Sequence, residues 1–266
     1  MMNDPWTPEH VRAFWARQAV EHGLSPSASW SDHQVIELEI QAVAPYLTDG
    51  DRVLDVGCAN GFSTLRWAAS RHVTIRGVDA VPEMIDQAQA RLRTLDAALR
   101  ERATFTIGDV LALPEPSGVY DKVIAVRVMI NLGDPERQLR GVRECARVLR
   151  PGGLLLLSEA TVQGWDRLNR LRAEWGLAAI PVPPFNRYVD QEGLTQAVAE
   201  QLECLAVIDF TSTYYVGTRV LKPLFQQAVG APVNVADPAA EWNRWWATLP
   251  ARGDYGVQKL FVLKKR

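Results

Sequence analysis

The chain has 266 residues, of which 47% are hydrophobic and 23% are charged, and its formal net charge is −2. This length suits one large domain with a sizeable core, and the near-zero charge gives no reason to expect nucleic acid or an anionic membrane as a partner. Cys58, Cys145 and Cys204 are scattered, and there is no Cys-x-x-Cys pair and no cluster of histidines, so we expect reduced thiols and no metal site. The sequence shows neither a leader pattern nor a run of about twenty apolar residues, and we therefore expect a cytoplasmic protein without a membrane span.

Residues 1–45 are predicted to form an N-terminal helical cap with a break at GLSPSASW. From residue 46 to residue 160, short apolar runs alternate with amphipathic stretches, which is the pattern of a parallel sheet covered by helices. The expected strands are 52–56, 73–78, 104–107, 122–128 and 154–158, and the expected helices are 62–70, 82–102 and 134–149.

Residues 161–266 are expected to complete the sheet. They contain predicted strands at 204–216 and 257–265 and predicted helices at 165–175 and 190–201. Two insertions rich in Trp and Pro, residues 161–189 and 216–250, are predicted to form a lid over the core. The expected fold class is therefore α/β, with a doubly wound, mostly parallel seven-stranded sheet and helical insertions in the N-terminal part and the C-terminal half.

The stretch VLDVGCANG joins the first predicted strand to a helix through small residues at alternate positions. Gly57, Ala59 and Gly61 leave backbone N–H groups open to a ligand, because no bulky side chain obstructs its approach. A phosphate-binding loop would end in Gly-Lys-Ser/Thr, whereas Gly61 is followed by Phe-Ser, and the spacing also departs from the dinucleotide pattern G-x-G-x-x-G. The turn therefore suits an uncharged or zwitterionic group better than a pyrophosphate.

Two acidic residues lie at the ends of the next two predicted strands. Asp79 ends the second strand, where a carboxylate can accept hydrogen bonds from both ribose hydroxyls, and Asp109 follows the third, where it can accept one from an adenine amino group. Either residue could instead be a turn residue or a helix cap. A free ribose diol, an adenine and a phosphate-free pocket describe S-adenosylmethionine better than NAD.

Five motifs in this order resemble those of the class I S-adenosylmethionine-dependent methyltransferases. They are VLDVGCANG, GVDAVPEM, GDV, YDKVIAVRVMINL and ECARVLRPGGLLLLSE. The resemblance covers residues 52–160 and extends more loosely, over the insertions, to enzymes that methylate small molecules and natural products. It implies a Rossmann-like fold and S-adenosylmethionine as the cofactor, with S-adenosylhomocysteine as its product.

The resemblance also assigns the cofactor contacts by position. The glycine-rich turn would surround the methionine part, Asp79 would hold the ribose, and the two residues at the GDV motif would meet the adenine edge. The family commonly has Gly where Ala59 stands, so the added methyl narrows the pocket there, and Met84 could be a plain core residue. The expected cofactor-binding residues are Asp55, Gly57, Ala59, Gly61, Asp79, Ala80, Met84, Asp109, Val110 and Arg127.

The residues that would position the methyl acceptor are less clearly marked. Arg127 ends an apolar strand and needs an anion, which is either a protein carboxylate or the carboxylate of the cofactor or the substrate. Asn131 is either a helix cap or a substrate contact, His33 is either a base or a surface or capping residue, and the aromatic side chains either enclose the acceptor or pack the insertions. The candidates are Arg127, Asn131, Trp30, His33, Tyr188 and Tyr214.

The sequence as a whole predicts an enzyme that transfers a methyl group to an oxygen or nitrogen, a carboxylate included, of a small molecule or short peptide. We expect a monomer or a homodimer. The alternatives are a non-catalytic partner subunit with the same fold, and a C-methyltransferase or other alkyl transferase or cyclase that uses the same cofactor. RVMINL stands where methyltransferases of nucleic-acid bases or protein glutamine carry an Asn/Asp-Pro-Pro-aromatic stretch, which argues against those substrates.

Overall fold

The computed structural model describes residues 6–230, 237 and 240–266. Residues 1–5 of the expected cap and residues 231–236 and 238–239 of the expected lid lie outside the described residues. In the described part, the strands are β1 (Arg52–Val56), β2 (Thr74–Asp79), β3 (Ala103–Ile107), β4 (Tyr120–Val126), β5 (Leu149–Ala160), β6 (Leu202–Ile208) and β7 (Gln258–Lys265). The α-helices are α1 (Pro8–His22), α2 (His33–Val43), α3 (Phe62–Ser70), α4 (Pro82–Arg93), α5 (Ala97–Arg102), α6 (Pro135–Val148), α7 (Val162–Glu174), α8 (Gln191–Ala197), α9 (Ser212–Tyr215), α10 (Lys222–Ala228) and α11 (Glu241–Ala247).

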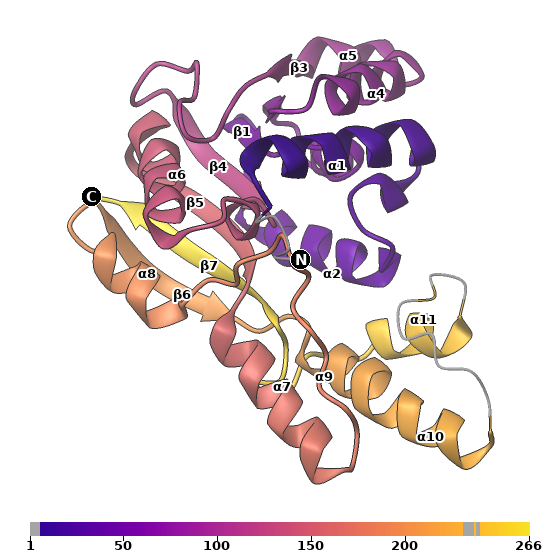
Figure 1. The fold of residues 1–266 in the computed structure, drawn as a ribbon. Helices are drawn as coiled ribbons and strands as arrows, with labels where there is room; N and C mark the ends of the chain where they lie inside the picture. The colour runs from indigo at the N-terminus through magenta and orange to yellow at the C-terminus, as the bar shows by residue number, and fades with distance from the viewer. Residues whose placement is uncertain (1–5, 231–236, 238–239) are drawn as a thin grey trace.

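The strands form one seven-stranded sheet in the described part of the chain, with the order β3-β2-β1-β4-β5-β7-β6 (Figure 1). The pairs from β3 to β5 are parallel, and β7 runs antiparallel between β5 and β6. This confirms the predicted doubly wound, mostly parallel sheet. The strand order reverses between β1 and β4, and in open α/β sheets ligands bind at the carboxyl ends of the strands at such a point.

Both faces of the sheet are covered, which explains why the middle parts of its central strands are apolar. On β1, Val53 belongs to a buried cluster with Ile36 of α2 and Leu65 of α3. The next residue, Leu54, faces the other way and joins a cluster that includes Val142 of α6. Successive side chains on a strand point to opposite faces, so one five-residue strand contributes to two cores.

Among the helices of the central part, α5 and α6 begin at the capping side chains of Asp96 and Asp134, whereas α3 and α4 begin without a side-chain cap. The predicted helix at 62–70 is present with the same bounds as α3, whereas the predicted helix at 82–102 is wrong as a single element. It is divided into α4 and α5, because the Asp96 carboxylate accepts a hydrogen bond from the Leu99 N–H at 2.8 Å and starts a new helix.

The predicted strand at 204–216 is also wrong beyond Ile208. β6 ends there, and α9, a π-helical segment (Val216–Leu221) and α10 follow one another without a break. A π-helical segment is rare and needs tertiary support. Here Arg219 forms a buried ion pair with Asp32, at 2.5 Å, which ties this insertion to the start of α2.

Candidate functional site

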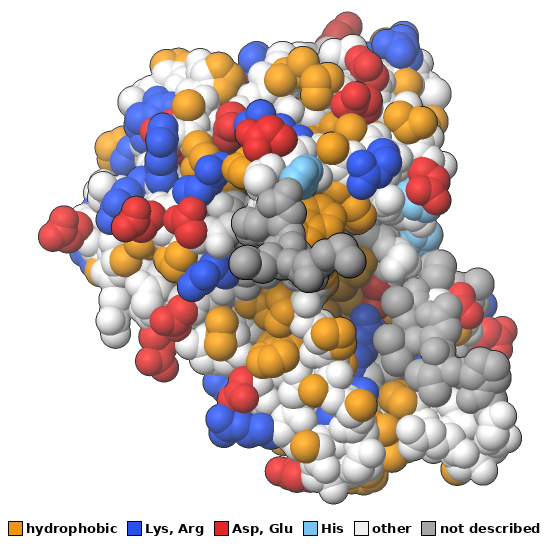
Figure 2. All heavy atoms as spheres, in the orientation of Figure 1, with side chains coloured by type: hydrophobic (Ala, Val, Ile, Leu, Met, Phe, Trp, Pro, Cys, Tyr) orange, Lys and Arg blue, Asp and Glu red, His pale blue; other side chains and the backbone are white. Residues whose placement is uncertain are grey.

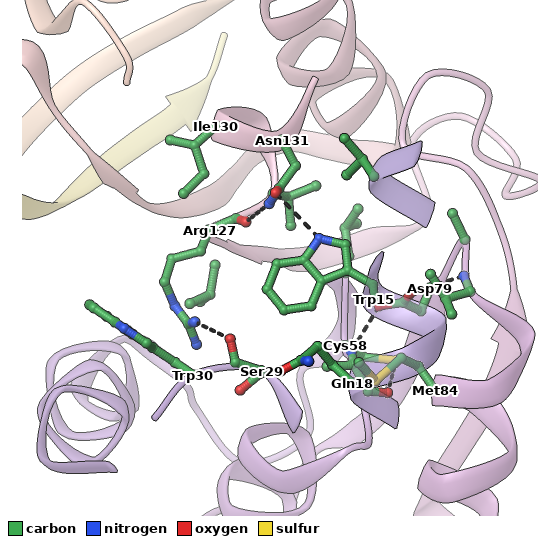
Figure 3. A pocket seen from close by; sticks show the side chains of 18 of the residues that line it. Trp15, Gln18, Ser29, Trp30, Cys58, Asp79, Met84, Arg127, Ile130 and Asn131 are labelled. Carbon is green, nitrogen blue, oxygen red and sulfur yellow. Dashed lines mark hydrogen bonds between the residues drawn. The ribbon is translucent and has the colours of Figure 1, made fainter. Parts of the chain in front are cut away.

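A cavity of about 530 Å³ lies at the carboxyl ends of β1, β2 and β4, and its volume is in the range of small-molecule sites. Its walls are the turns after these strands, helix α1 with residues 27–31, and the segment 183–188. Figure 2 shows hydrophobic side chains gathered around a hollow on this face. In Figure 3, Trp15 of α1 and Arg127 lie on opposite sides of the cavity.

The small residues between β1 and α3 form a left-handed turn along this cavity. The φ angles are 71° at Gly57, 46° at Ala59 and 72° at Gly61. A Cβ atom on Gly57 would lie 2.3 Å from a methyl group of Val128, so only glycine fits there. The non-glycine residue, Ala59, is held by its N–H, which donates to the Asp79 carboxylate at 2.9 Å. The turn therefore presents backbone rather than side chains to a ligand.

Two carboxylates lie at the ends of adjacent strands beside this turn. Asp55 accepts a hydrogen bond from the Thr64 hydroxyl at 2.5 Å, and burial raises the pKa of Asp55 to about 7. Asp79 accepts from the N–H groups of Ala59 and Val81, each at 2.9 Å, and burial raises its pKa to about 6. The Ala80 N–H also interacts with Asp79, and since a carboxylate has about four lone-pair sites, one remains for a hydroxyl of a ligand.

Asp109, Val110, Ala80 and Met84 all line the same end of the cavity. The Asp109 carboxylate is half-buried and forms an ion pair with Arg12 of α1 at 3.0 Å. Helix α1 also donates from the Trp15 ring N–H to the Asn131 side-chain oxygen at 3.3 Å. α1 is therefore bonded to both edges of the cavity and forms its roof.

Arg127 occupies a strained position after β4. Its φ angle of 56° is unusual for a residue with a side chain. Its Nε donates to Glu39 at 3.2 Å, one terminal nitrogen donates to the Ser29 carbonyl at 3.1 Å, and the guanidinium stacks on Trp30 at 4.9 Å. Of the two partners that the sequence left open for Arg127, a protein carboxylate is present.

The loop that carries Arg127 is fixed from beneath by Glu159. This side chain is fully buried and accepts hydrogen bonds from three consecutive N–H groups, those of Val128, Met129 and Ile130. The Asn131 amide closes the loop by donating to the Arg127 carbonyl at 2.7 Å. The Asn131 amide therefore has a structural role: its nitrogen donates to the Arg127 carbonyl, and its oxygen accepts from the Trp15 ring N–H.

The other acceptor candidates divide into two groups. Trp30 and Tyr188 line the cavity, together with Arg127 and Asn131. His33 instead contacts the Ser27 hydroxyl at 2.8 Å, and the buried Tyr214 hydroxyl donates to Asp32 at 2.7 Å. Neither of these two belongs to the cavity lining.

Three residues that shape the site were not found from the sequence. Glu39 and Glu159 hold the Arg127 loop, and Gln258 of β7 lines the cavity. Each lies in an element that reads as ordinary amphipathic helix or core strand. The one available signal was for Glu159, a carboxylate just after the apolar run at 154–157; Gln258 stands at the polar start of its strand and carries no such signal.

Comparison with known proteins decides the family. Residues 53–153 match the family described as "Methyltransferase domain". The chain is 31% identical over 189 residues to the malonyl-[acyl-carrier protein] O-methyltransferase of Erwinia billingiae (strain Eb661), which covers 68% of this chain and 67% of that protein. This chain belongs to the class I S-adenosylmethionine-dependent methyltransferases.

This methyltransferase is also 34% identical over 113 residues to the 27-O-demethylrifamycin SV methyltransferase of Amycolatopsis mediterranei (strain S699), with coverage of 42% of this chain and 40% of that protein. The chain thus spans about two fifths of the length of the first curated relatives that it matches. Its fold resembles that of the geranyl diphosphate C-methyltransferase from Streptomyces coelicolor A3(2), with a TM-score of 0.56 at 15% identity over 99% of this chain and 100% of that one.

Two further findings concern the described part of the chain as a whole. None of the described helices combines the length and the apolar character needed to cross a bilayer. Within residues 6–230, 237 and 240–266, no three His, Cys, Asp or Glu side chains form a group that could hold a metal ion.

Proposed function

We propose that this chain transfers the methyl group of S-adenosylmethionine to an oxygen or nitrogen of a small molecule or short peptide. The observation that carries the proposal is a single cavity that joins a backbone-lined turn and two acidic strand ends to a chamber with aromatic walls. Two relatives are named for O-methyl transfer, which supports oxygen as the acceptor atom.

The residues at the strand ends fit the cofactor. The left-handed turn at Gly57, Ala59 and Gly61 presents backbone to the cavity, which suits the methionine part, and Val128 packs against Gly57 where a Cβ atom would otherwise stand. The acceptor capacity that the Asp79 carboxylate keeps suits a hydroxyl of the ribose. Asp55 orients the turn, Ala80 and Met84 flank the adenine, and Asp109 with Val110 would meet its edge.

When bound, S-adenosylmethionine supplies a methyl group on a positively charged sulfur, which is already a good leaving group. The protein therefore mainly has to align the acceptor with the methyl group and exclude water. The roof formed by α1 can do both. Trp15 and Phe14 of α1 pack edge-on at 5.0 Å, and Phe185 of the lid segment lies 4.8 Å from Phe14, between ring centroids, so that α1 and the lid segment are joined.

Isothermal titration of the purified protein with S-adenosylmethionine tests the cofactor assignment. We expect saturable binding with one site, and Asp79→Asn should weaken it about tenfold or more, because a charge-assisted hydrogen bond to the ribose is lost. Asp96→Asn is the matched control, since Asp96 caps the exposed helix α5 away from the cavity. Equal affinity for the wild type and Asp79→Asn would refute the ribose assignment. Failure to form S-adenosylhomocysteine with any acceptor would favour a non-catalytic role.

A further inference from the structure

The two ends of the cavity differ in their hydrogen-bonding chemistry. Among the described lining residues, all three carboxylates, Asp55, Asp79 and Asp109, lie at or just after the ends of β1, β2 and β3, and the single imidazole, His22, is on α1. In the described part of the chain, the end formed by the β4 loop, β7 and the segment 183–188 has no carboxylate in its lining; it includes Arg127, Gln258 and Tyr188, and also Asn186, whose side-chain oxygen is buried without a hydrogen-bond partner. The side chains of Arg127, Gln258 and Tyr188 can all donate hydrogen bonds.

The orientation of Gln258 is fixed by its partner. Gln258 is 5% exposed, and its side-chain oxygen accepts a hydrogen bond from the Tyr215 hydroxyl. Burial holds the pKa of Tyr215 well above its usual value, so this phenol remains a donor. The Gln258 side chain lines the cavity, and its amide nitrogen donates to none of the described residues. It is therefore left to donate to a ligand.

Tyr188 adds a second donor near the same place. Burial raises its pKa to about 12, so its hydroxyl keeps its proton at neutral pH. No described residue accepts a hydrogen bond from this hydroxyl, and Tyr188 lines the cavity. Tyr215 lies within electrostatic range of both Tyr188 and Glu39, which places Tyr188, Gln258 and the Glu39–Arg127 pair in one neighbourhood.

Arg127 supplies the third donor and a positive charge. Two of its three guanidinium nitrogens are bonded, to Glu39 and to the Ser29 carbonyl, and the remaining terminal nitrogen bonds to no described residue. Figure 3 shows the side chain extending along the cavity toward Trp30, with Ile130 nearby. Stacking on Trp30 holds the guanidinium plane in place.

We propose that this end of the cavity receives a carboxylate of the acceptor and that the reaction product is its methyl ester; this rests on the methyl-transfer function proposed above. A carboxylate can only accept hydrogen bonds, and Arg127, Gln258 and Tyr188 can all donate them. Among the described residues, no carboxylate lines this end of the cavity to repel it. The aromatic ring or other flat apolar group that carries this carboxylate in the acceptor would lie against Trp15, Trp30 and Ile130.

The chemistry balances without a base. A lone pair of the carboxylate oxygen forms the new O–CH₃ bond while the bond between the methyl carbon and the sulfur breaks, and its electron pair stays on the sulfur. The anion and the sulfonium give a neutral ester and a neutral thioether, and no proton moves. Since a carboxylic acid with a pKa of about 4 is ionised at neutral pH, no imidazole is needed beside the acceptor.

Binding to the protein saturated with S-adenosylhomocysteine tests the proposal. The probes are benzoate, cinnamate and 2-naphthoate, each compared by isothermal titration with its own primary carboxamide, which has nearly the same shape. We expect at least one carboxylate to bind about tenfold or more tightly than its amide, the effect of a charge-assisted hydrogen bond. If no carboxylate exceeds its amide, the case in which neither binds included, the proposal is overturned.

Three variants locate the contact. Gln258→Met and Tyr188→Phe should each weaken the preferred carboxylate about threefold to tenfold while S-adenosylhomocysteine still binds, and Arg127→Gln should abolish the preference over the amide. Tyr255→Phe is the control, because it removes a hydroxyl from an exposed tyrosine that does not line the cavity. If Arg127→Gln fails to fold because Glu39 is left unpaired, the proposal is judged on Gln258→Met and Tyr188→Phe, and unchanged carboxylate binding in both variants overturns it.

Measuring turnover separates the proposal of a carboxylate acceptor from the proposal of methyl transfer itself. With S-adenosylmethionine, the preferred carboxylate should gain one methyl group, which mild alkali removes as expected for an ester. A methyl group found on a ring carbon, a phenol or an amine of an acceptor would overturn the carboxylate assignment and leave the methyl-transfer function standing. Loss of all cofactor binding would instead refute the methyl-transfer function.

Discussion

Asp32 joins two distant parts of the chain, and replacing it gives a prediction with a calculable size. The residue is fully buried at the start of α2. Its carboxylate accepts hydrogen bonds from the Val35 N–H at 3.3 Å, from the Tyr214 hydroxyl at 2.7 Å and from Arg219 at 2.5 Å. The N-terminal cap and the C-terminal insertion are therefore held together through one side chain.

Removal of one partner from a buried ion pair costs about 3 to 5 kcal/mol, and loss of a helix cap costs about 0.5 to 2 kcal/mol. Asp32→Ala should thus lower the free energy of unfolding by about 4 to 6 kcal/mol, a large part of the total for a protein of this size. Asp32→Asn keeps an oxygen for the Val35 N–H and the Tyr214 hydroxyl but leaves the Arg219 charge uncompensated. It should cost about 3 kcal/mol.

Urea unfolding followed by tryptophan fluorescence measures these values. Asp96→Ala is the control, because Asp96 caps α5 at an exposed position without a buried ion pair, and it should cost about 1 kcal/mol. The double variant Asp32→Ala/Arg219→Met should lose at least about 1 kcal/mol less than the sum of the single losses. If Asp32→Ala cost no more than Asp96→Ala, the reasoning about this buried pair would be wrong.

Two further predictions concern the turn between β1 and α3. Gly57→Ala should cost about 2 to 4 kcal/mol and weaken S-adenosylmethionine binding, because it adds left-handed strain and places a Cβ atom 2.3 Å from Val128. Burial raises the pKa of Asp55 to about 7, above that of an unfolded aspartate, so its contribution to stability is present at low pH and is lost as the pH rises toward 7. Asp55→Asn should therefore gain stability relative to the wild type as the pH rises from about 4 to about 8 without cofactor, by about 4 kcal/mol, since the pKa of Asp55 lies about 3 above that of an unfolded aspartate and each pKa unit is worth about 1.4 kcal/mol.

Each of these predictions has its own check. Gly50→Ala is the control for the first, since Gly50 has a φ of 90° but nothing within 4 Å of an added Cβ atom, so only the backbone strain remains. If Gly57→Ala and Gly50→Ala lowered the free energy of unfolding equally, Val128 would have to move away from the added Cβ atom without cost, and the steric argument would be wrong. For the second, thermal unfolding at several pH values is measured, and parallel curves for the wild type and Asp55→Asn would contradict the raised pKa.

The sequence was sufficient for the part of the fold where local pattern and tertiary packing agree. β1 and α3 have the expected bounds, because a strand buried on both faces and a helix after a small-residue turn leave few alternatives. The same agreement places the expected cofactor residues on one edge of the sheet, since the carboxyl ends of parallel strands meet there.

The prediction from residue pattern was wrong where contacts with distant residues outweigh the local preference for a strand. The residues around Tyr214 and Tyr215 are β-branched and aromatic, which favours a strand, but their hydroxyls bond to Asp32 and Gln258, and they lie in a helix. Glu39, which pairs with Arg127, is 88 residues away in the sequence, and no periodicity connects two such positions.

The place of β7 between β5 and β6 affects the order in which the site can be assembled. Gln258 is the first residue of β7, and every other cavity-lining residue precedes it in the chain. During synthesis, the strand ends that carry Asp55, Asp79 and Asp109 can thus be made while the end of the cavity near Arg127 and Tyr188 still lacks Gln258. The wall of the cavity at Gln258 is therefore the last part of its lining to leave the ribosome, after every residue of the turn between β1 and α3.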